Sequence, residues 1–233
     1  MDGNGRWARR HGWKRIRGHE SGVEAVRDTV EAAAEWGLRN LTLYSFSVEN
    51  WQRPRAEVGA LMALLRRFLI EERPTLLDNN IRLQAIGRVQ DLPAESAAVL
   101  RETEALTAGC DGMVLRLALS YGGRQELVEA AQRLAGQALR GELSVEELDE
   151  DRFRAALYDP AMPDPDLVIR TAGEQRLSNF LLWQASYAEF HFADELWPDF
   201  RRQHLLRALS DYHSRVRRFG RVLDSDPAVR QPR

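Results

Sequence analysis

Leu41-Thr42-Leu43-Tyr44-Ser45-Phe46-Ser47 is a short, largely apolar run of residues that favour β-structure. Such a run is typical of a strand buried on both faces of a parallel sheet. A polar cluster follows it directly, with Glu49, Asn50, Trp51 and Arg53 ahead of Pro54. Because ligands bind beyond the carboxyl ends of parallel strands, this stretch predicts an α/β fold with a site where the strand ends.

The rest of the chain alternates in the same way between strand and helix patterns. Further strands are expected at 81–87, 113–121, 167–169 and 189–192, and helices at 21–36, 54–69, 93–107, 122–139 and 201–218. A capping box, Ser144 with Glu147, predicts one more helix start. This order predicts a central, mostly parallel sheet covered by helices on both faces, in one domain spanning 1–223, with a flexible tail at 224–233.

Composition describes an ordinary globular chain. Its 233 residues are 44% hydrophobic and 29% charged, with a net charge of −2. The lone cysteine, Cys110, fits a reducing cytoplasm. No apolar run approaches the ~20 residues that span a bilayer, and no signal peptide is recognisable. We therefore expect a cytoplasmic protein whose contact with the inner face of the membrane is peripheral.

The N-terminus carries a second unusual stretch, Met1-Asp2-Gly3-Asn4-Gly5-Arg6-Trp7-Ala8-Arg9-Arg10. Its glycines allow tight turns that bring backbone N–H groups close to a ligand. One carboxylate, Asp2, stands beside a cluster of basic residues, which suggests a divalent cation shared with phosphate oxygens. The alternative is a solvated basic arm. Loops at 122–124 and 170–178 follow other predicted strands, so all these polar segments are expected to form one anion site.

The spaced motifs resemble the cis-prenyltransferases, the family of undecaprenyl diphosphate synthases. The blocks are Asp-Gly-Asn-Gly-Arg-Trp-Ala at 2–8, Arg15 with Gly18-His19, Ser-Val-Glu-Asn-Trp-Gln-Arg-Pro at 47–54, Tyr-Gly-Gly-Arg at 121–124, Arg-Thr-Ala-Gly-Glu at 170–174, Arg176 with Ser-Asn-Phe-Leu at 178–181, and Glu189 ahead of Leu-Trp-Pro-Asp at 196–199. The resemblance implies condensation of isopentenyl diphosphate with an allylic diphosphate, farnesyl or geranyl diphosphate, to give a cis-polyprenyl diphosphate. Undecaprenyl diphosphate, a cell-wall lipid carrier, is the expected product. Mg²⁺ and a homodimer are also implied.

The resemblance also implies roles for individual residues. Asp2 would be the catalytic carboxylate that holds Mg²⁺ on the allylic diphosphate, Glu189 would be the second metal ligand, and Asn50 would assist proton removal. Residues expected to bind the allylic diphosphate are Gly3, Asn4, Gly5, Arg6, Arg15 and His19. Those expected to bind isopentenyl diphosphate are Arg170, Arg176 and Ser178. The remaining expected substrate-site residues are Trp7, Ser47, Val48, Glu49, Trp51, Arg53 and Leu177.

Several alternatives stay open at this point. Trp7 and Trp51 are equally well explained as core aromatics, His19 as a loop histidine, and Glu174 as the cap of a following helix. The apolar helix at 58–69, with small Gly59, Ala60 and Ala63, is ordinary core, the wall of a tunnel for a growing chain, or both. A short-chain synthase and a non-catalytic partner subunit are the rival functions. The net charge and a basic face without interleaved aromatics argue against nucleic-acid binding.

The chain departs from the family pattern in a few places. Ala172 stands where glycine is usual, Ser120 where asparagine is usual, and Arg17 where an uncharged residue is common. Asp2 also has no strand before it in this sequence. We expect a native product with roughly 10–25 more residues ending in a short strand that supports the Asp2 loop.

Overall fold

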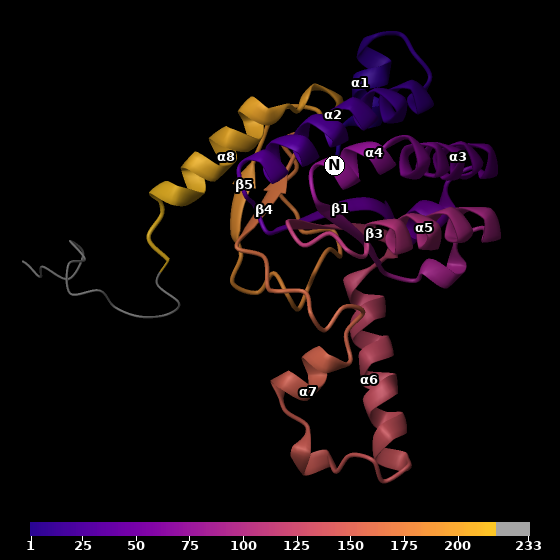
Figure 1. The fold of residues 1–233 in the computed structure, drawn as a ribbon, viewed down its shortest axis with the longest axis vertical. Coiled ribbons are helices and arrows are strands. Elements are labelled where there is room, and N and C mark those ends of the chain that lie inside the picture. Colours follow the sequence, from indigo (N-terminus) through magenta and orange to yellow (C-terminus); the bar gives the residue numbers. More distant parts are fainter. Residues whose placement is uncertain (218–233) are drawn as a thin grey trace, which may run out of the picture.

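Five strands form the centre of the computed structural model, which describes residues 1–217, and every strand pair is parallel (Figure 1). Three of them pair in the order β1 (Asn40–Ser47), β3 (Met113–Tyr121) and β2 (Ile81–Ile86). The other two, β4 (Leu167–Arg170) and β5 (Glu189–Phe192), form a separate parallel pair. The α/β class and all five predicted strands are confirmed, but the strands form two sheets where the sequence predicted one.

Strand β3 is central because it can be buried on both faces. Leu115, Leu117 and Leu119 are at most 2% exposed on one side, and Ala118 is fully buried on the other. Arg116 is the charged exception, and it is satisfied by Asp159 and Asn40 at 2.7 Å each. The strand therefore has the near-continuous burial that parallel sheets require.

Four helices pack on one face of the three-stranded sheet. They are α2 (Arg15–Glu35), α3 (Arg55–Glu71), α4 (Arg73–Asp78) and α5 (Ala94–Thr107). Their buried side chains, among them Ala33, Phe68, Leu76 and Leu100, join the leucines of β2 and β3 in one core cluster. This burial of apolar surface holds the helix layer to the sheet.

The opposite face is covered mostly by non-helical segments. Met162, Leu181 and Ala185 pack there against Val168 of β4 and Tyr121 of β3. Helices α6 (Gly123–Leu139) and α7 (Glu150–Ala155) project from the body as an arm (Figure 1). The predicted capping box at Ser144 is present, but it starts a 3₁₀ turn, Val145–Glu147.

The final helix, α8 (Arg202–Ser214), lies beside β5 and ends four residues earlier than predicted. Residues 218–233 lie outside the part of the chain that the structure describes. The tail predicted at 224–233 and the short family-like motif at 218–220 are therefore untested.

Helix α1 (Asn4–Arg10) packs closely on α2, and two glycines set its start and its approach to α2. Gly3 precedes α1 with a φ of +106°, a conformation that side chains rarely adopt. A Cβ on Gly18 would lie 1.9 Å from the Asn4 carbonyl oxygen. Helix α2 starts at Arg15 rather than at 21, because Gly18 is a helix-packing residue and not part of a loop.

Candidate active site

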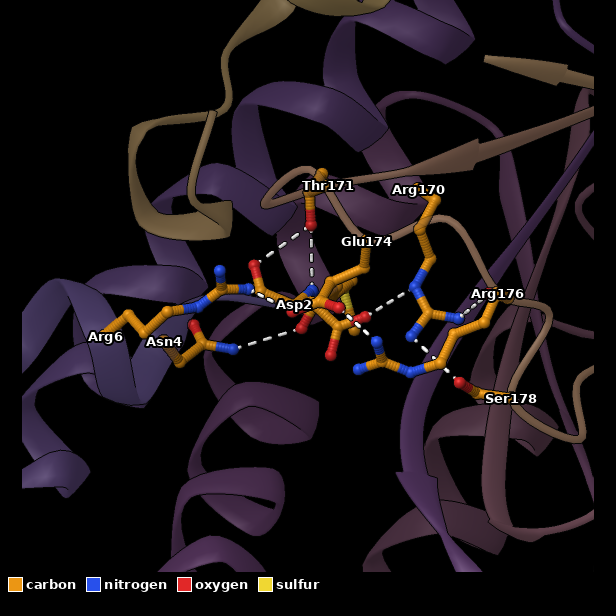
Figure 2. Close-up of polar contacts among 9 residues, drawn as sticks. Asp2, Asn4, Arg6, Arg170, Thr171, Glu174, Arg176 and Ser178 are labelled. Atoms are coloured by element: carbon orange, nitrogen blue, oxygen red, sulfur yellow. Dashed lines mark hydrogen bonds and ion pairs between the residues drawn. The ribbon is translucent and has the colours of Figure 1, made fainter. Parts of the chain in front are cut away.

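A cavity of about 1340 Å³ lies between the two sheets. Consecutive residues of both β1 and β4 line it, so it runs along the edges of these strands rather than over one face. Its apolar lining includes Val23, Val26, Leu43, Phe46, Leu61, Leu65, Phe68 and Leu117 from α2, α3, β1 and β3, together with side chains of β4 and α8. The charged lining includes the residues around Asp2 and Arg170 (Figure 2), together with Arg15 and Arg53. One cavity thus joins a charged site to an apolar compartment.

Most of the predicted site residues line this cavity. They are Asp2, Gly3, Asn4, Gly5, Arg6, Arg15, His19, Ser47, Glu49, Asn50, Arg53, Arg170, Arg176, Leu177 and Ser178. Trp7, Val48, Trp51 and Glu189 do not line it.

Trp7 and Trp51 have structural contacts instead. The Trp7 indole N–H donates to Asp199 at 2.7 Å, and the Trp51 indole N–H donates to Ser120 at 2.9 Å. The expectation that these two tryptophans bind substrate is not supported by their positions.

The backbone of Asp2 is fixed by residues far along the chain. Its N–H donates to the Thr171 hydroxyl at 2.8 Å, and its carbonyl accepts from that hydroxyl at 3.0 Å and from the Trp197 N–H at 2.9 Å. The sequence predicted support from an upstream strand, whereas these bonds come from the loop after β4 and the 3₁₀ turn Trp197–Asp199. The Asp2 carboxylate is therefore presented by a held backbone.

Arg170 connects Asp2 to the loop that follows β4. Its Nε lies 2.8 Å from Asp2 Oδ2, its Nη2 donates to the Ser178 hydroxyl at 3.0 Å, and its Nη1 donates to the Arg176 carbonyl (Figure 2). Only the two Nη groups meet hydrogen-bond geometry, and the buried Nε has no aligned acceptor. An unaligned buried donor beside a carboxylate fits a ligand oxygen that would complete the arrangement.

Glu174 lies between two arginines from different parts of the chain. Its Oε1 accepts from Arg6 at 2.6 Å, and its Oε2 pairs with Arg176 (Figure 2). No helix begins between Glu174 and β5, so the alternative that Glu174 caps a following helix is wrong. Its carboxylate occupies a position between guanidinium groups that suits a phosphate group equally well.

The turn after β1 forms another wall of the cavity. The 3₁₀ helix Val48–Gln52 is capped by Ser47 and Asn50, whose Oδ1 accepts from the Ser47 N–H at 3.2 Å. Glu49 accepts from Asn179 at 2.9 Å. Burial opposes ionisation of Glu49, but hydrogen bonds from Asn179, its own backbone and Ser47 outweigh this effect, so the pKa of Glu49 is lowered.

His19 is a neutral imidazole in this site. Burial lowers the pKa of His19 from 6.5 to about 4, with Arg53 and Arg15 acting in the same direction and Glu57 opposing them. Its Nε2 is buried and has no hydrogen-bond partner. Because buried polar atoms are normally satisfied, a ligand or water is expected at this nitrogen. Its position in the cavity favours a binding role over that of a simple loop histidine.

The residues present fit a Mg²⁺ ion at Asp2 but not one shared with Glu189. Mg²⁺ is commonly held by one or two carboxylates together with waters and substrate phosphates, and the half-exposed Asp2 can supply such a carboxylate. Glu189 on β5 pairs with Leu167 on β4. Leu167 is three residues before Arg170, so Glu189 lies roughly 10 Å from Arg170 along the strand direction. It pairs with Arg215 at 2.8 Å. The predicted two-carboxylate site is not formed in this structure.

Helix α3 contributes large side chains to the cavity wall. Leu61, Met62, Leu65 and Phe68 line the cavity, whereas Gly59, Ala60 and Ala63 do not. The helix is therefore both core and cavity wall, and its large side chains rather than its small ones form that wall.

Sequence reasoning missed three residues that shape the site. Thr171 holds the Asp2 backbone, Glu174 bridges two arginines, and Asn179 binds both Glu49 and the backbone of Arg124. Thr171 and Glu174 lie within the predicted polar loop after β4, and Asn179 directly follows it. Their position in or next to that loop was the available signal, but their partners lie elsewhere in the sequence.

Comparisons with known proteins agree with this geometry. The family model described as "Putative undecaprenyl diphosphate synthase" matches residues 1–220. An isoprenyl transferase from Chlorobaculum tepidum is 49% identical over 95% of this chain and 84% of its own length. The ditrans,polycis-undecaprenyl-diphosphate synthase ((2E,6E)-farnesyl-diphosphate specific) of Micrococcus luteus is 46% identical over 94% and 88%.

A solved structure is also similar. It is lavandulyl diphosphate synthase from Lavandula x intermedia in complex with dimethylallyl diphosphate, which matches with a TM-score of 0.92 and 37% identity over 94% of this chain and 95% of that one. The chain therefore belongs to the undecaprenyl diphosphate synthase family of prenyltransferases, which are enzymes that transfer isoprenyl groups.

Proposed function

We propose that this protein condenses isopentenyl diphosphate with an allylic diphosphate to form a cis-polyprenyl diphosphate. The observation that carries the proposal is the continuity between a guanidinium-rich site and an apolar cavity of about 1340 Å³. Both substrates have a diphosphate group and a hydrocarbon chain. A cavity with one charged part and one apolar part matches such molecules, and arginine forks bind diphosphate oxygens in pairs.

The reaction breaks one bond and forms another at the same carbon. The C1–O bond of the allylic substrate breaks and its electron pair leaves with diphosphate, while the C3–C4 double bond of isopentenyl diphosphate attacks C1. Loss of a proton from C2 of the isopentenyl unit then creates the new double bond. Arginines aligned with the leaving diphosphate stabilise its growing charge, and fixed sites for two substrates supply proximity.

Individual residues have defined tasks in this proposal. Arg15 and neutral His19 bind the allylic diphosphate, and Arg170 with Ser178 binds isopentenyl diphosphate. Asn50 is an amide and cannot take a proton itself. It orients the isopentenyl unit so that oxygens of the released diphosphate accept the C2 proton.

Magnesium is part of the proposal through Asp2. Enzymes of this family are Mg²⁺-dependent in general. Held by the Asp2 carboxylate and diphosphate oxygens, the ion would neutralise charge on the leaving group. Arg170 positions that carboxylate through the ion pair at 2.8 Å.

Product length separates the main proposal from its alternative. We propose a long product, undecaprenyl diphosphate, because the cavity exceeds the ~300–1,000 Å³ of ordinary small-ligand pockets. The similarity to lavandulyl diphosphate synthase favours a short-chain enzyme as the second candidate. Mass spectrometry of the product made from farnesyl diphosphate and excess labelled isopentenyl diphosphate decides between them. A protein that incorporates no label would instead be a non-catalytic partner subunit.

We also propose that the enzyme works as a homodimer. Phe192 on β5 and Leu206 on the neighbouring α8 are 43% and 52% exposed, which leaves apolar surface for a second copy. Analytical ultracentrifugation of the wild type and of Phe192→Asp tests this. If the wild type and Phe192→Asp are both dimers, the interface lies elsewhere. If the wild type is a monomer, the proposal is rejected.

A further inference from the structure

Helix α1 and the turn into α2 present a surface that the proposed reaction does not use. We call it the basic turn, and it consists of Arg9, Arg10, His11, Trp13, Lys14 and Arg17, all of them exposed. Residues 1–20 carry a net charge of +4, whereas the whole chain carries −2. Figure 1 places this turn at the periphery of the molecule. The positive charge is therefore concentrated on one protruding corner.

Three cations of the basic turn have no acidic partner in the described part of the chain. Within residues 1–217, Arg9, Arg10 and Lys14 form no ion pair, whereas Arg17 pairs with Glu20 at 3.0 Å. The other nearby carboxylates are occupied as well, since Glu24 lies 3.8 Å from Arg201 and Asp199 accepts from Trp7. Exposed cations without a partner remain available to an external anionic surface.

Aromatic rings lie among these cations. Trp13 is 50% exposed, and its ring lies 5.2 Å from the His11 ring and 5.5 Å from the Trp7 ring. The expectation that the basic face lacks aromatics is therefore wrong. An exposed indole among arginines and lysine is the combination found where proteins meet the headgroup layer of a membrane.

We propose that the basic turn docks this protein on the surface of an anionic lipid bilayer. A protruding corner fits a plane, whereas single-stranded nucleic acid is bound along a groove with a row of free aromatic faces. Here the three rings contact one another instead of forming such a row. Arg9 also lines the cavity, so docking would bring the charged part of the cavity close to the lipid headgroups. No helix within residues 1–217 is long and apolar enough to cross a membrane, and this docking requires none.

Vesicle co-sedimentation tests the proposal with the full chain. Wild type should bind vesicles of phosphatidylcholine mixed with phosphatidylglycerol, bind pure phosphatidylcholine weakly, and lose binding as salt is raised. Each basic residue near such a surface strengthens binding on the order of fivefold, so Arg10→Gln/Lys14→Gln should weaken it by roughly 25-fold. Trp13→Ala should weaken binding with an unchanged salt dependence.

The matched control is Arg101→Gln/Arg152→Gln, which removes two exposed charges from α5 and α7 and should bind like wild type. Prenyl transfer from a water-soluble primer without lipid should be equal in all variants, because Arg10, Trp13 and Lys14 do not line the cavity. The proposal is overturned if wild type ignores anionic vesicles at low salt or if the control loses as much binding. It is also overturned if the Arg10/Lys14 variant loses affinity for a single-stranded oligonucleotide but keeps its affinity for vesicles.

Discussion

Arg6 and Arg176 are held together by one carboxylate, because Glu174 accepts from Arg6 at 2.6 Å and also pairs with Arg176. Arg6 and Glu174 are 168 positions apart in sequence. The resemblance assigns these arginines to two different substrates, yet in this structure they share an anion. A diphosphate that reaches either arginine must compete with Glu174.

Glu174→Gln should therefore bind inorganic diphosphate more tightly than wild type. The variant keeps the shape of the side chain and removes the competing charge. Because Arg6 and Arg176 are well exposed, its free energy of unfolding should fall by less than about 1 kcal/mol. Isothermal titration without metal measures the affinity. Weaker binding in Glu174→Gln would show instead that the carboxylate orients the arginines for the ligand.

Replacement of single arginines should separate the two substrate sites. Arg15→Ala should raise mainly the KM for the allylic substrate, and Arg170→Ala mainly the KM for isopentenyl diphosphate. Arg6→Ala and Arg176→Ala should affect both substrates, since Glu174 connects them. Steady-state kinetics with each substrate varied in turn give the four KM pairs. If both KM values change equally in the Arg15 and Arg170 variants, the assignment of these two arginines to different substrates is wrong.

Asp2→Ala should lower turnover by orders of magnitude and leave the fold intact. The backbone of residue 2 is held by Thr171 and Trp197, and these bonds do not need its side chain. A chelator should abolish turnover of the wild type, and added Mg²⁺ should restore it. Circular dichroism checks the fold of the variant. Full activity in excess chelator contradicts a metal at Asp2.

His19 should make the protein less stable as the pH falls. The pKa of His19 is 6.5 in the unfolded chain and about 4 in the folded protein, so the unfolded state takes up the proton first. Stability is therefore lost between these two values, by about 2 kcal/mol near pH 5. His19→Gln should lose this part of the pH dependence. Urea titrations of both proteins across that range measure it, and parallel curves would contradict it.

Ala172→Gly should stabilise the protein by about 1 kcal/mol, which is about 2–4 °C in Tm for a chain of this size. Ala172 has a φ of +69°, a left-handed conformation that costs little only for glycine. The departure from the family's usual glycine thus creates strain beside the site. Gly173→Ala is the matched control, because Gly173 has a φ of +66° and should lose stability. If calorimetry shows no gain in Tm for Ala172→Gly, the alanine at this position does not strain the loop.

The sequence by itself determined the strands and the chemical character of the site, whereas the helix α1 and the start of α2 were not predicted. Local patterns gave all five strands within one residue at each end, because alternation and burial are properties of neighbouring residues. The polar segments after the strands predicted an anion site, since parallel strands bring their carboxyl ends together. The spaced motifs identified the family, and most of their residues line the cavity.

Only the tertiary structure decided which side chains meet. It turns Trp7 and Trp51 away from the cavity, sets Glu189 against Arg215 at the opposite end of β4 from Arg170, and makes Thr171 the support of Asp2. These contacts join loops whose approach depends on the packing of α1, α2 and β4 around one another. A local sequence pattern cannot predict these contacts, because an arginine such as Arg6 pairs with whichever carboxylate the folded chain brings within reach.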